Sequence, residues 1–247
     1  MANGGSATPS VEDYYNSLES RLGYWLLLGN ARHCGYWAPN TLWPFPISRA
    51  QRTMEAKLHA RLALPNGSRV FDAGAGSGLV ASYMARQGLV VEGVDLTPRH
   101  VREAQQLIRR RGLEEQVAVR LGDYHDLPST QYRNGSFDGV LVLHEADLHQ
   151  SSEALSTVLQ LSHCPNTLPQ GSYEQLLHET GFGEISLEDY SDNVLPLWRL
   201  FGVLGAVPYA VLRLAGAETR FVNVMAGVET YRHWDQGRYI SVRAVKL

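Results

Sequence analysis

The chain has 247 residues and a formal net charge of −3, with a pI near 6.3. That length accommodates one α/β domain with a sizeable core. A basic run at 109–111 falls at the end of a predicted helix, so we see no footprint for nucleic acid. Two cysteines, Cys34 and Cys164, are too few for a disulfide framework, and neither has the neighbours of a zinc site. We therefore expect a cytoplasmic protein that binds no metal.

The start of the chain divides into two parts. Residues 1–10 are polar, lack the apolar segment of a signal peptide and are expected to be disordered. Residues 11–247 are predicted to form a single domain, which opens with a helical cover over 11–60. This cover carries many aromatic side chains and begins with a predicted helix over 11–28. Most of these aromatic rings are expected to pack in a core.

A glycine-rich turn follows a short apolar strand at residues 70–78, which read Val-Phe-Asp-Ala-Gly-Ala-Gly-Ser-Gly. Three glycines occupy alternate positions: Gly74, Gly76 and Gly78. Glycine lacks a Cβ, so the backbone can approach a ligand closely. The third glycine comes one residue too early for the dinucleotide pattern, and Asp72 would repel a phosphate. An acid at this place suits a ligand with a cationic amine.

A second acid completes this pattern. Asp95 ends the apolar run 89–94 and lies 95 − 72 = 23 positions after Asp72. In a βαβ unit, an acid about 20 residues past the glycine turn can bind a ribose diol. A turn that only joined a strand to a helix would not require both acids and the three glycines. We therefore expect a nucleoside ligand with an amine and without a phosphate.

These residues resemble the class I S-adenosylmethionine-dependent methyltransferases, whose first motif is matched throughout residues 70–78. The resemblance implies an α/β fold with a Rossmann-like sheet, strand order 3-2-1-4-5-7-6 and helices on both faces. It implies S-adenosylmethionine as the cofactor, bound by a core over 66–146. Cofactor-binding roles are implied for the residues at the ends of the first two strands: Asp72, Gly74, Gly76, Gly78, Asp95 and Leu96.

The next elements extend the resemblance. A helix is predicted from Thr97 to residue 111, with Gly112 as its cap, and a strand over 117–121. The family implies that Asp123, just after this strand, accepts a hydrogen bond from the adenine amine. Tyr124 is then expected to stack on the adenine ring. The alternative for Asp123 is an ordinary turn acid.

The cover also resembles parts of two kinds of methyltransferase. Tyr14-Tyr15 resembles a His/Tyr-Tyr pair in the ubiquinone-type and sterol-type enzymes, which implies that Tyr15 covers the cofactor. Residues 22–37 resemble small-molecule methyltransferases of fungal secondary metabolism.

A fourth strand is predicted over 137–143, and its end is implied to face the reacting methyl group. His144 is our first candidate for a catalytic base, with Glu145 beside it. His149 and His33 are further candidates. For each histidine, the alternative is a surface or packing role.

The sequence departs from the family after the fourth strand. A helix is predicted over 145–161, but residues 162–171 contain no apolar run of β type, and a helix over 173–180 leads directly to Gly181. The fifth strand of the family is therefore predicted to be missing. Its loss would leave one edge of the fourth strand unpaired, or would force the seventh strand to pair with the fourth. A turn and strand are expected over 181–188, and the last strand over 238–245.

An apolar segment over 194–214 lies inside a predicted insertion, 190–236. Its length could span a bilayer. Charged residues and prolines interrupt it: Pro196, Arg199, Pro208 and Arg213. We expect a helical lid over an apolar substrate, with peripheral membrane contact as a further expectation. The alternative is that the segment only covers the core.

Three functions agree with these features. The first is methyl transfer to a small, largely apolar molecule such as a secondary metabolite. The second is a cyclase or isomerase that uses the same scaffold without methylating, since the fold does not fix the function. The third is a non-catalytic cofactor-binding or interaction protein left by the loss of the fifth strand. The sequence leaves the oligomeric state open.

Overall fold

A computed structural model describes residues 11–127, 135–142, 146–148, 152–153, 156 and 168–246. Four residues discussed above lie outside this part of the chain: His144, Glu145, His149 and Cys164. The segment 1–10, which was expected to be disordered, lies outside it as well. Cys34 is a buried, free thiol.

The N-terminal cover consists of α1 (Val11–Asn16), α2 (Leu18–Leu28) and α3 (Ile47–Leu62). The prediction of one helix over 11–28 was wrong, because the helix is interrupted at Ser17. The Ser17 side chain accepts a hydrogen bond from the backbone N–H of Ser20 at 3.1 Å and so caps α2.

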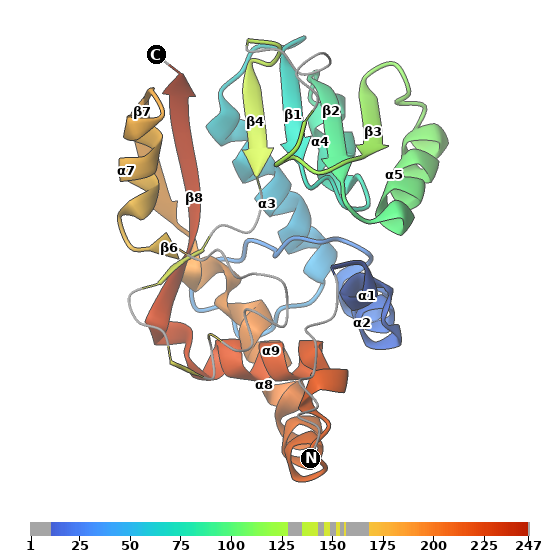
Figure 1. Ribbon diagram of the computed structural model, residues 1–247, viewed down its shortest axis with the longest axis vertical. Helices are drawn as coiled ribbons and strands as arrows, with labels where there is room; N and C mark the ends of the chain where they lie inside the picture. The colour runs from blue at the N-terminus through green and yellow to red at the C-terminus, as the bar shows by residue number, and fades with distance from the viewer. Residues whose placement is uncertain are drawn as a thin grey trace, which may run out of the picture.

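The first sheet is parallel, with the order β3-β2-β1-β4 (Figure 1). Its strands are β1 (Arg69–Ala73), β2 (Val90–Asp95), β3 (Val117–Leu121) and β4 (Gly139–Val142). The connecting helices are α4 (Leu79–Arg86) and α5 (Pro98–Arg111), and Gly112 ends α5 with φ 63°. The Rossmann-like arrangement expected from the glycine motif is confirmed.

The main core lies between this sheet and its helices. Val70 and Val91 are fully buried on the central strands, and Ala81, Met84 and Ala104 pack against them from α4 and α5. A parallel sheet with covered faces requires such near-continuous apolar strands. The core therefore fixes the ends of β1 and β2, where the predicted site lies.

A second sheet has the order β6-β5-β8-β7. Its strands are β5 (Ala146–Leu148), β6 (Leu168–Pro169), β7 (Phe182–Asp189) and β8 (Gly237–Lys246), and α7 (Ser172–Glu179) precedes β7. β7 and β8 form the antiparallel pair that was expected at the end of the chain. Figure 1 shows this pair standing apart from β4.

Two predictions for the middle of the chain were wrong. Residues 146–148 form a strand that pairs antiparallel with β8, although a helix was expected there. Leu168–Pro169 form a short strand parallel to β5, although no strand was expected. Among the described residues, no strand lies beside both β4 and β8 in space. The first residues of β8 pair with β5. Of the two alternatives given for a missing fifth strand, the pairing of β8 with β4 does not occur among the described residues.

Arg61 of α3 joins the second sheet to the rest of the molecule. Its guanidinium donates to the backbone oxygens of Ser186 on β7, at 2.8 Å, and of Ser241 on β8, at 3.1 Å. It also forms an ion pair with Glu188. One side chain thus holds both strands of the pair against the cover.

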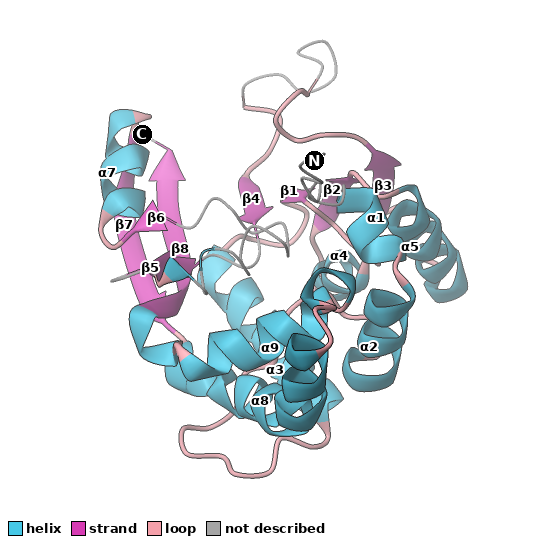
Figure 2. Ribbon diagram, turned by 60° about the horizontal axis from the view of Figure 1, so that its bottom comes forward, coloured by secondary structure: helices cyan, strands magenta, loops and turns pink. Residues whose placement is uncertain are grey.

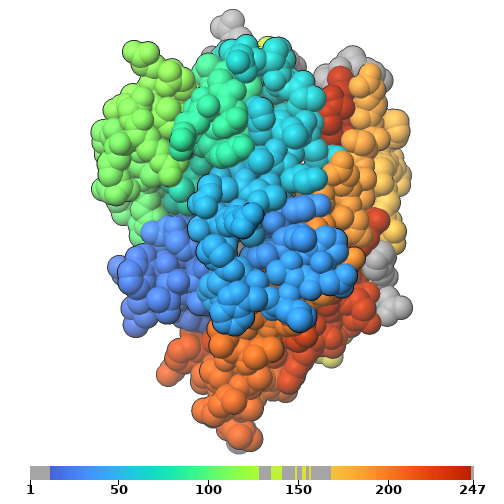
Figure 3. Space-filling model, turned by 180° about the vertical axis from the view of Figure 1, so that it is seen from behind, coloured from blue at the N-terminus to red at the C-terminus, as the bar shows by residue number. Residues whose placement is uncertain are grey.

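The insertion between β7 and β8 is helical, as predicted. It contains α8 (Ser191–Leu214), η1 (Glu218–Arg220), α9 (Val222–Arg232) and η2 (Trp234–Gln236). α8 alone among the described helices is long and apolar enough to cross a membrane, and only 28% of its most apolar window is buried. In Figure 2, α8 and α9 lie side by side, and Figure 3 shows the cover between the first sheet and this insertion.

Candidate cofactor site

The glycine turn lies where β1 ends and α4 begins. Gly74, Gly76 and Gly78 have φ angles of 92°, 54° and 75°, which strain any other residue. A Cβ on Gly78 would lie 2.9 Å from the Cβ of Ala104, so this glycine lets α4 pack on α5. A Cβ on Gly74 would meet nothing within 4 Å. The space beside Gly74 is therefore open to a ligand.

Asp72 is a buried carboxylate without a hydrogen-bond partner in the described part of the chain. Its pKa is raised to about 7, first by burial and then by the charge of Asp95, while the charge of His33 opposes the shift. Buried polar groups are normally paired, so an orphaned carboxylate indicates a missing partner. A cationic amine is the partner that would satisfy it.

His33 lies close enough to Asp72 to act on its charge. Its Nδ1 is 3.0 Å from the backbone oxygen of Cys34, and its Nε2 is 3.4 Å from a carboxylate oxygen of Glu55. The second contact has ion-pair distance but lacks hydrogen-bond geometry. The ring is buried and both of its nitrogens face protein atoms, and a role of His33 as a base stays a prediction from the sequence.

Asp95 ends β2 beneath the glycine turn. One oxygen accepts from the backbone N–H of Gly76 at 2.8 Å, and the other accepts from that of Thr97 at 2.8 Å and faces His100 Nδ1 at 3.2 Å. Burial raises the pKa of Asp95, but the contact with His100 and the two backbone hydrogen bonds outweigh it, so the net pKa is lowered. Asp95 is therefore a fixed anion at the edge of the sheet.

Three further predicted residues lie at the same edge. Asp95 pairs with Leu121 across β2 and β3, which places Leu96 beside the segment that carries Asp123 and Tyr124. Leu96 and Tyr124 are exposed. One oxygen of Asp123 accepts from the backbone N–H of His125 at 2.9 Å, and hydrogen bonds from His125 lower the pKa of Asp123. The edge thus presents a carboxylate and two apolar surfaces next to Asp95.

Tyr124 already has a ring neighbour. Its ring centroid lies 4.1 Å from that of His125, with an interplanar angle of 32°. Tyr15, the predicted covering residue, has its ring centroid 4.7 Å from that of His100, in an edge-to-face arrangement. The structure therefore brings Tyr15 to the Asp95 side of the site.

The sequence did not single out two residues at this site. His100 lies in the first turn of α5 and contacts Asp95, and Arg32 contacts His100 from the loop after α2. The spacing of five positions between Asp95 and His100 could have predicted their contact, because the first turn of a helix faces the strand end that precedes it. Arg32 gave no such signal.

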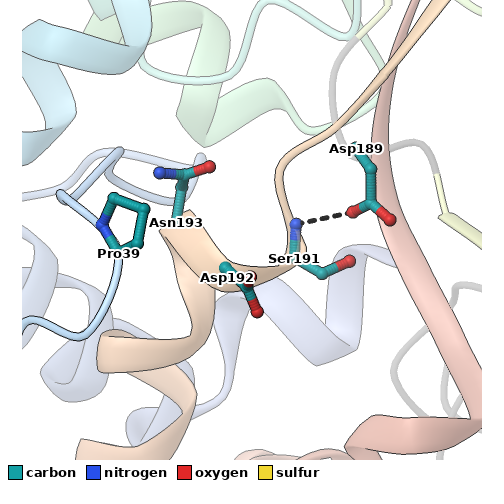
Figure 4. A pocket seen from close by; sticks show the side chains of 5 residues that line it. All are labelled: Pro39, Asp189, Ser191, Asp192 and Asn193. Carbon is teal, nitrogen blue, oxygen red and sulfur yellow. Dashed lines mark hydrogen bonds between the residues drawn. The ribbon is translucent and has the colours of Figure 1, made fainter.

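Two hollows lie away from this edge. One, of about 280 Å³, lies where β7 meets α8 and is lined by Pro39, Asp189, Ser191, Asp192 and Asn193 (Figure 4). The other, of about 440 Å³, lies between α2 and η1. The first is lined mainly by polar groups that bond to their own turn, such as the Ser191 N–H to Asp189 at 2.8 Å. Neither hollow contains a residue of the glycine turn. Asp72, the glycine turn and Asp95 therefore define the candidate site.

Known proteins share these features. Residues 70–163 match a family described as a methyltransferase domain. An S-adenosyl-L-methionine-dependent Diels-Alderase of Talaromyces variabilis is 34% identical over 281 residues, covering 98% of this chain and 96% of that protein. A second such Diels-Alderase, of Neonectria sp. (strain DH2), is 43% identical over 124 residues, covering 50% of this chain and 51% of that protein. The crystal structure of the [4+2]-cyclase SpnF matches with a TM-score of 0.66 and 19% identity over 93% of this chain and 94% of that one.

The chain belongs to the class I S-adenosylmethionine-dependent methyltransferase family, and S-adenosylmethionine is its cofactor. The orphaned Asp72 and the open space at Gly74 fit this ligand, which carries an amine and a ribose but no phosphate. The alignment with the Talaromyces protein runs over 281 positions and this chain has 247 residues, so at least 34 residues of that protein have no counterpart here. This chain is therefore shorter than the Talaromyces protein over the aligned region.

Proposed function

We propose that this chain closes a ring in a small, largely apolar polyene by [4+2] cycloaddition, with S-adenosylmethionine bound and unconsumed. The similarity to a Diels-Alderase over nearly the full length of both proteins carries this proposal. This is the cyclase function, one of the three that the sequence left open. Methyl transfer then becomes the alternative.

In this proposal, each residue of the site has one task. Asp72 receives the amine of the cofactor, Gly74 lets the ligand approach the backbone, and Asp95 binds the ribose hydroxyls. Leu96 and Tyr124 enclose the adenine ring, and Asp123 accepts from its amine. When bound, the cofactor would supply a permanent positive charge within the site.

Cycloaddition suits a site of this kind. Two new carbon–carbon σ bonds form from one diene and one alkene, the remaining π electrons shift, and no atom or proton leaves. The protein therefore has to hold the two reacting segments together and exclude water.

The second candidate is methyl transfer to an acceptor of the same class. The match of residues 70–163 to the methyltransferase domain favours it. An oxygen or nitrogen acceptor would need a base, for which His144 and Glu145 stay our predictions from the sequence.

One experiment separates the candidates. Purified protein is incubated with S-adenosylmethionine labelled in its methyl group and with synthetic linear compounds in which a conjugated diene is tethered to an isolated alkene. A product of unchanged mass that has lost the diene absorbance, with the label still in the cofactor, supports cycloaddition. A labelled product supports methyl transfer. If the folded protein binds the cofactor and converts none of these compounds, the proposal of cycloaddition on this class is contradicted, and the non-catalytic function gains support.

A further inference from the structure

A buried chain of contacts links the cover to the cofactor edge. Arg32 Nε donates to His100 Nε2 at 3.2 Å, and His100 Nδ1 lies 3.2 Å from an oxygen of Asp95. The other oxygen of Asp95 holds the backbone N–H of Gly76. His100 is 2% exposed, so water does not compete for these contacts.

The contacts fix the tautomer of His100. The guanidinium of an arginine keeps its protons in proteins, so Arg32 Nε must be the donor and His100 Nε2 the acceptor. A neutral imidazole has one donor and one acceptor nitrogen, so the proton lies on Nδ1 and points at Asp95. Arg32 thereby forces His100 to donate to the carboxylate that is expected to bind the ribose.

Arg32 is itself held over the glycine turn. Its Cγ would lie 3.1 Å from a Cβ on Gly76, and its guanidinium carbon lies 4.3 Å from the ring centroid of Tyr24. One terminal nitrogen donates to the backbone oxygen of Asn30 at 3.1 Å, and the other lies 3.6 Å from Glu103 of α5. A second tie runs from the Ser77 hydroxyl to the backbone oxygen of Asn30 at 2.8 Å. The loop after α2 is therefore fastened to the glycine turn itself.

We propose that Arg32 and His100 are positioning residues for the cofactor: Arg32 locks His100 in its Nδ1–H form, and His100 holds the Asp95 carboxylate in place for the ribose. The cover then acts on cofactor affinity through this pair, as well as by covering the site. The inference rests on cofactor binding and is independent of whether the chain cyclises or methylates.

The first test is calorimetric titration of the full chain with S-adenosylmethionine in the absence of substrate. Arg32→Met and His100→Leu should each weaken binding by about tenfold, as expected for losing a hydrogen bond that involves a charged group. The double variant should also lose about tenfold, not a hundredfold, because the two residues act in one chain. Arg21→Met is the matched control, because Arg21 is an exposed arginine of the same cover, and its affinity should stay within twofold.

Replacing His100 by two amides gives a rescue test. An asparagine places its amide near the position of Nδ1 and can still donate to Asp95, whereas a glutamine reaches toward the position of Nε2. His100→Asn should therefore bind within about threefold of the wild type, and His100→Gln should resemble His100→Leu. A residue that only filled space would favour glutamine, the larger amide.

The tautomer gives a readout that does not depend on the cofactor. In the free protein, the nitrogen NMR shifts of His100 should show a protonated Nδ1 and a bare Nε2, and Arg32→Met should remove this preference. A protonated Nε2 in the wild type would overturn the proposal. So would wild-type affinity in folded Arg32→Met, or additive losses in the double variant.

Discussion

The two halves of this molecule differ in how they hold their polar groups. In the first sheet, Asp95 and the glycine turn are fixed by short buried hydrogen bonds within one βαβ unit. In the second sheet, the β7–β8 pair is attached through Arg61, which reaches it from α3. The hydrogen bonds of Asp95 thus join neighbouring segments, with further contacts to the loop after α2, whereas the β7–β8 pair is attached by a contact between distant segments.

The cofactor site therefore lies apart from the strands whose pairing differs from the expected order. The order β3-β2-β1-β4 places the cofactor edge on the side of β1 away from the rearranged strands. The family's fifth strand is expected beyond β4; among the described residues, β8 pairs with β5 and β7, while β1, β2 and β3 stay in register. The two halves should therefore respond separately to substitution.

The largest expected effect is at Asp72. Asp72→Asn should weaken S-adenosylmethionine binding by about a hundredfold, since the amine loses its buried anion. The same change should stabilise the free protein, because the pKa of Asp72 is about 7 when folded, well above the ordinary value of 3.8 for an aspartate. For an acid with a raised pKa, stability is present below the unfolded pKa and is lost as the pH rises through the folded pKa. The variant should therefore gain about 2–4 kcal/mol at pH 8, and clearly less at pH 5.

Chemical denaturation without ligand, at both pH values, measures this gain. Glu92→Gln is the control, because Glu92 is a carboxylate on β2 that pairs with Arg69 and Arg120 at the surface. It should change neither affinity nor stability by much. An Asp72→Asn protein that is less stable than the wild type at pH 8 would contradict the assignment of Asp72 as an orphaned anion.

The next effect is expected in the other half. Arg61→Met removes hydrogen bonds to two strands and the ion pair with Glu188, so we expect a loss of about 2–3 kcal/mol in the free energy of unfolding. Hydrogen exchange should become faster in β7 and β8 and stay unchanged in β1, β2 and β3. Cofactor affinity should remain within twofold.

Lys57→Met is the matched control, because it removes another cation of α3. The Lys57 amine lies over the ring of Tyr36, 5.0 Å from its centroid, and not on the β7–β8 backbone. It should leave the exchange of both sheets unaltered. Equal acceleration in the two sheets of Arg61→Met would mean that the halves unfold as one unit.

The sequence predicted the cofactor half well because its constraints are local. Asp72 and Asp95 are 23 positions apart with the glycines between them, and strand and helix spacing places them together. Arg32 could not be predicted, since it reaches the glycine turn by side-chain packing from a loop 44 positions before Gly76. No period or motif connects two such segments.

The second half was predicted less well for the opposite reason. The stretch 146–148 was expected to be helical, yet it forms β5 because β8 offers it a ladder of backbone hydrogen bonds. Strand formation depends on tertiary context more than helix formation does. The insertion was predicted correctly as helical, since its apolar pattern is long enough to form a helix on its own.

A smaller effect concerns pH. Asp72 must lose its proton to bind the amine, and its pKa is about 7 in the free protein. Affinity for S-adenosylmethionine should therefore be about tenfold weaker at pH 6 than at pH 8. Calorimetry in buffers of different ionisation enthalpy should show nearly one proton released per cofactor at pH 6. Adenosine has the ribose and the base without the amine, so its affinity should stay constant over this range; a parallel fall would place the titrating group elsewhere.

The smallest effect is expected on the exposed side of α8. Val203, Val207, Val211 and Leu214 follow a helical spacing and are each more than half exposed. The exposed cations Arg213 and Arg220 lie at the end of this stripe, where Glu218 is 4.0 Å from Arg213. An apolar stripe with cations at one end suits the surface of an anionic bilayer, which was an expectation from the sequence.

Vesicles that contain an anionic phospholipid should therefore bind the protein weakly, and Val207→Glu should reduce the bound fraction by several-fold, since each buried apolar side chain contributes about 1–2 kcal/mol. Leu42→Glu adds the same charge at another exposed apolar position, in the cover, and should have no effect. Cofactor affinity should be unchanged in both variants, because α8 lies outside the first sheet. If Val207→Glu and the wild type bind vesicles equally, the stripe does not face lipid. If the wild type is a dimer that does not bind vesicles and Val207→Glu separates it, the stripe faces protein.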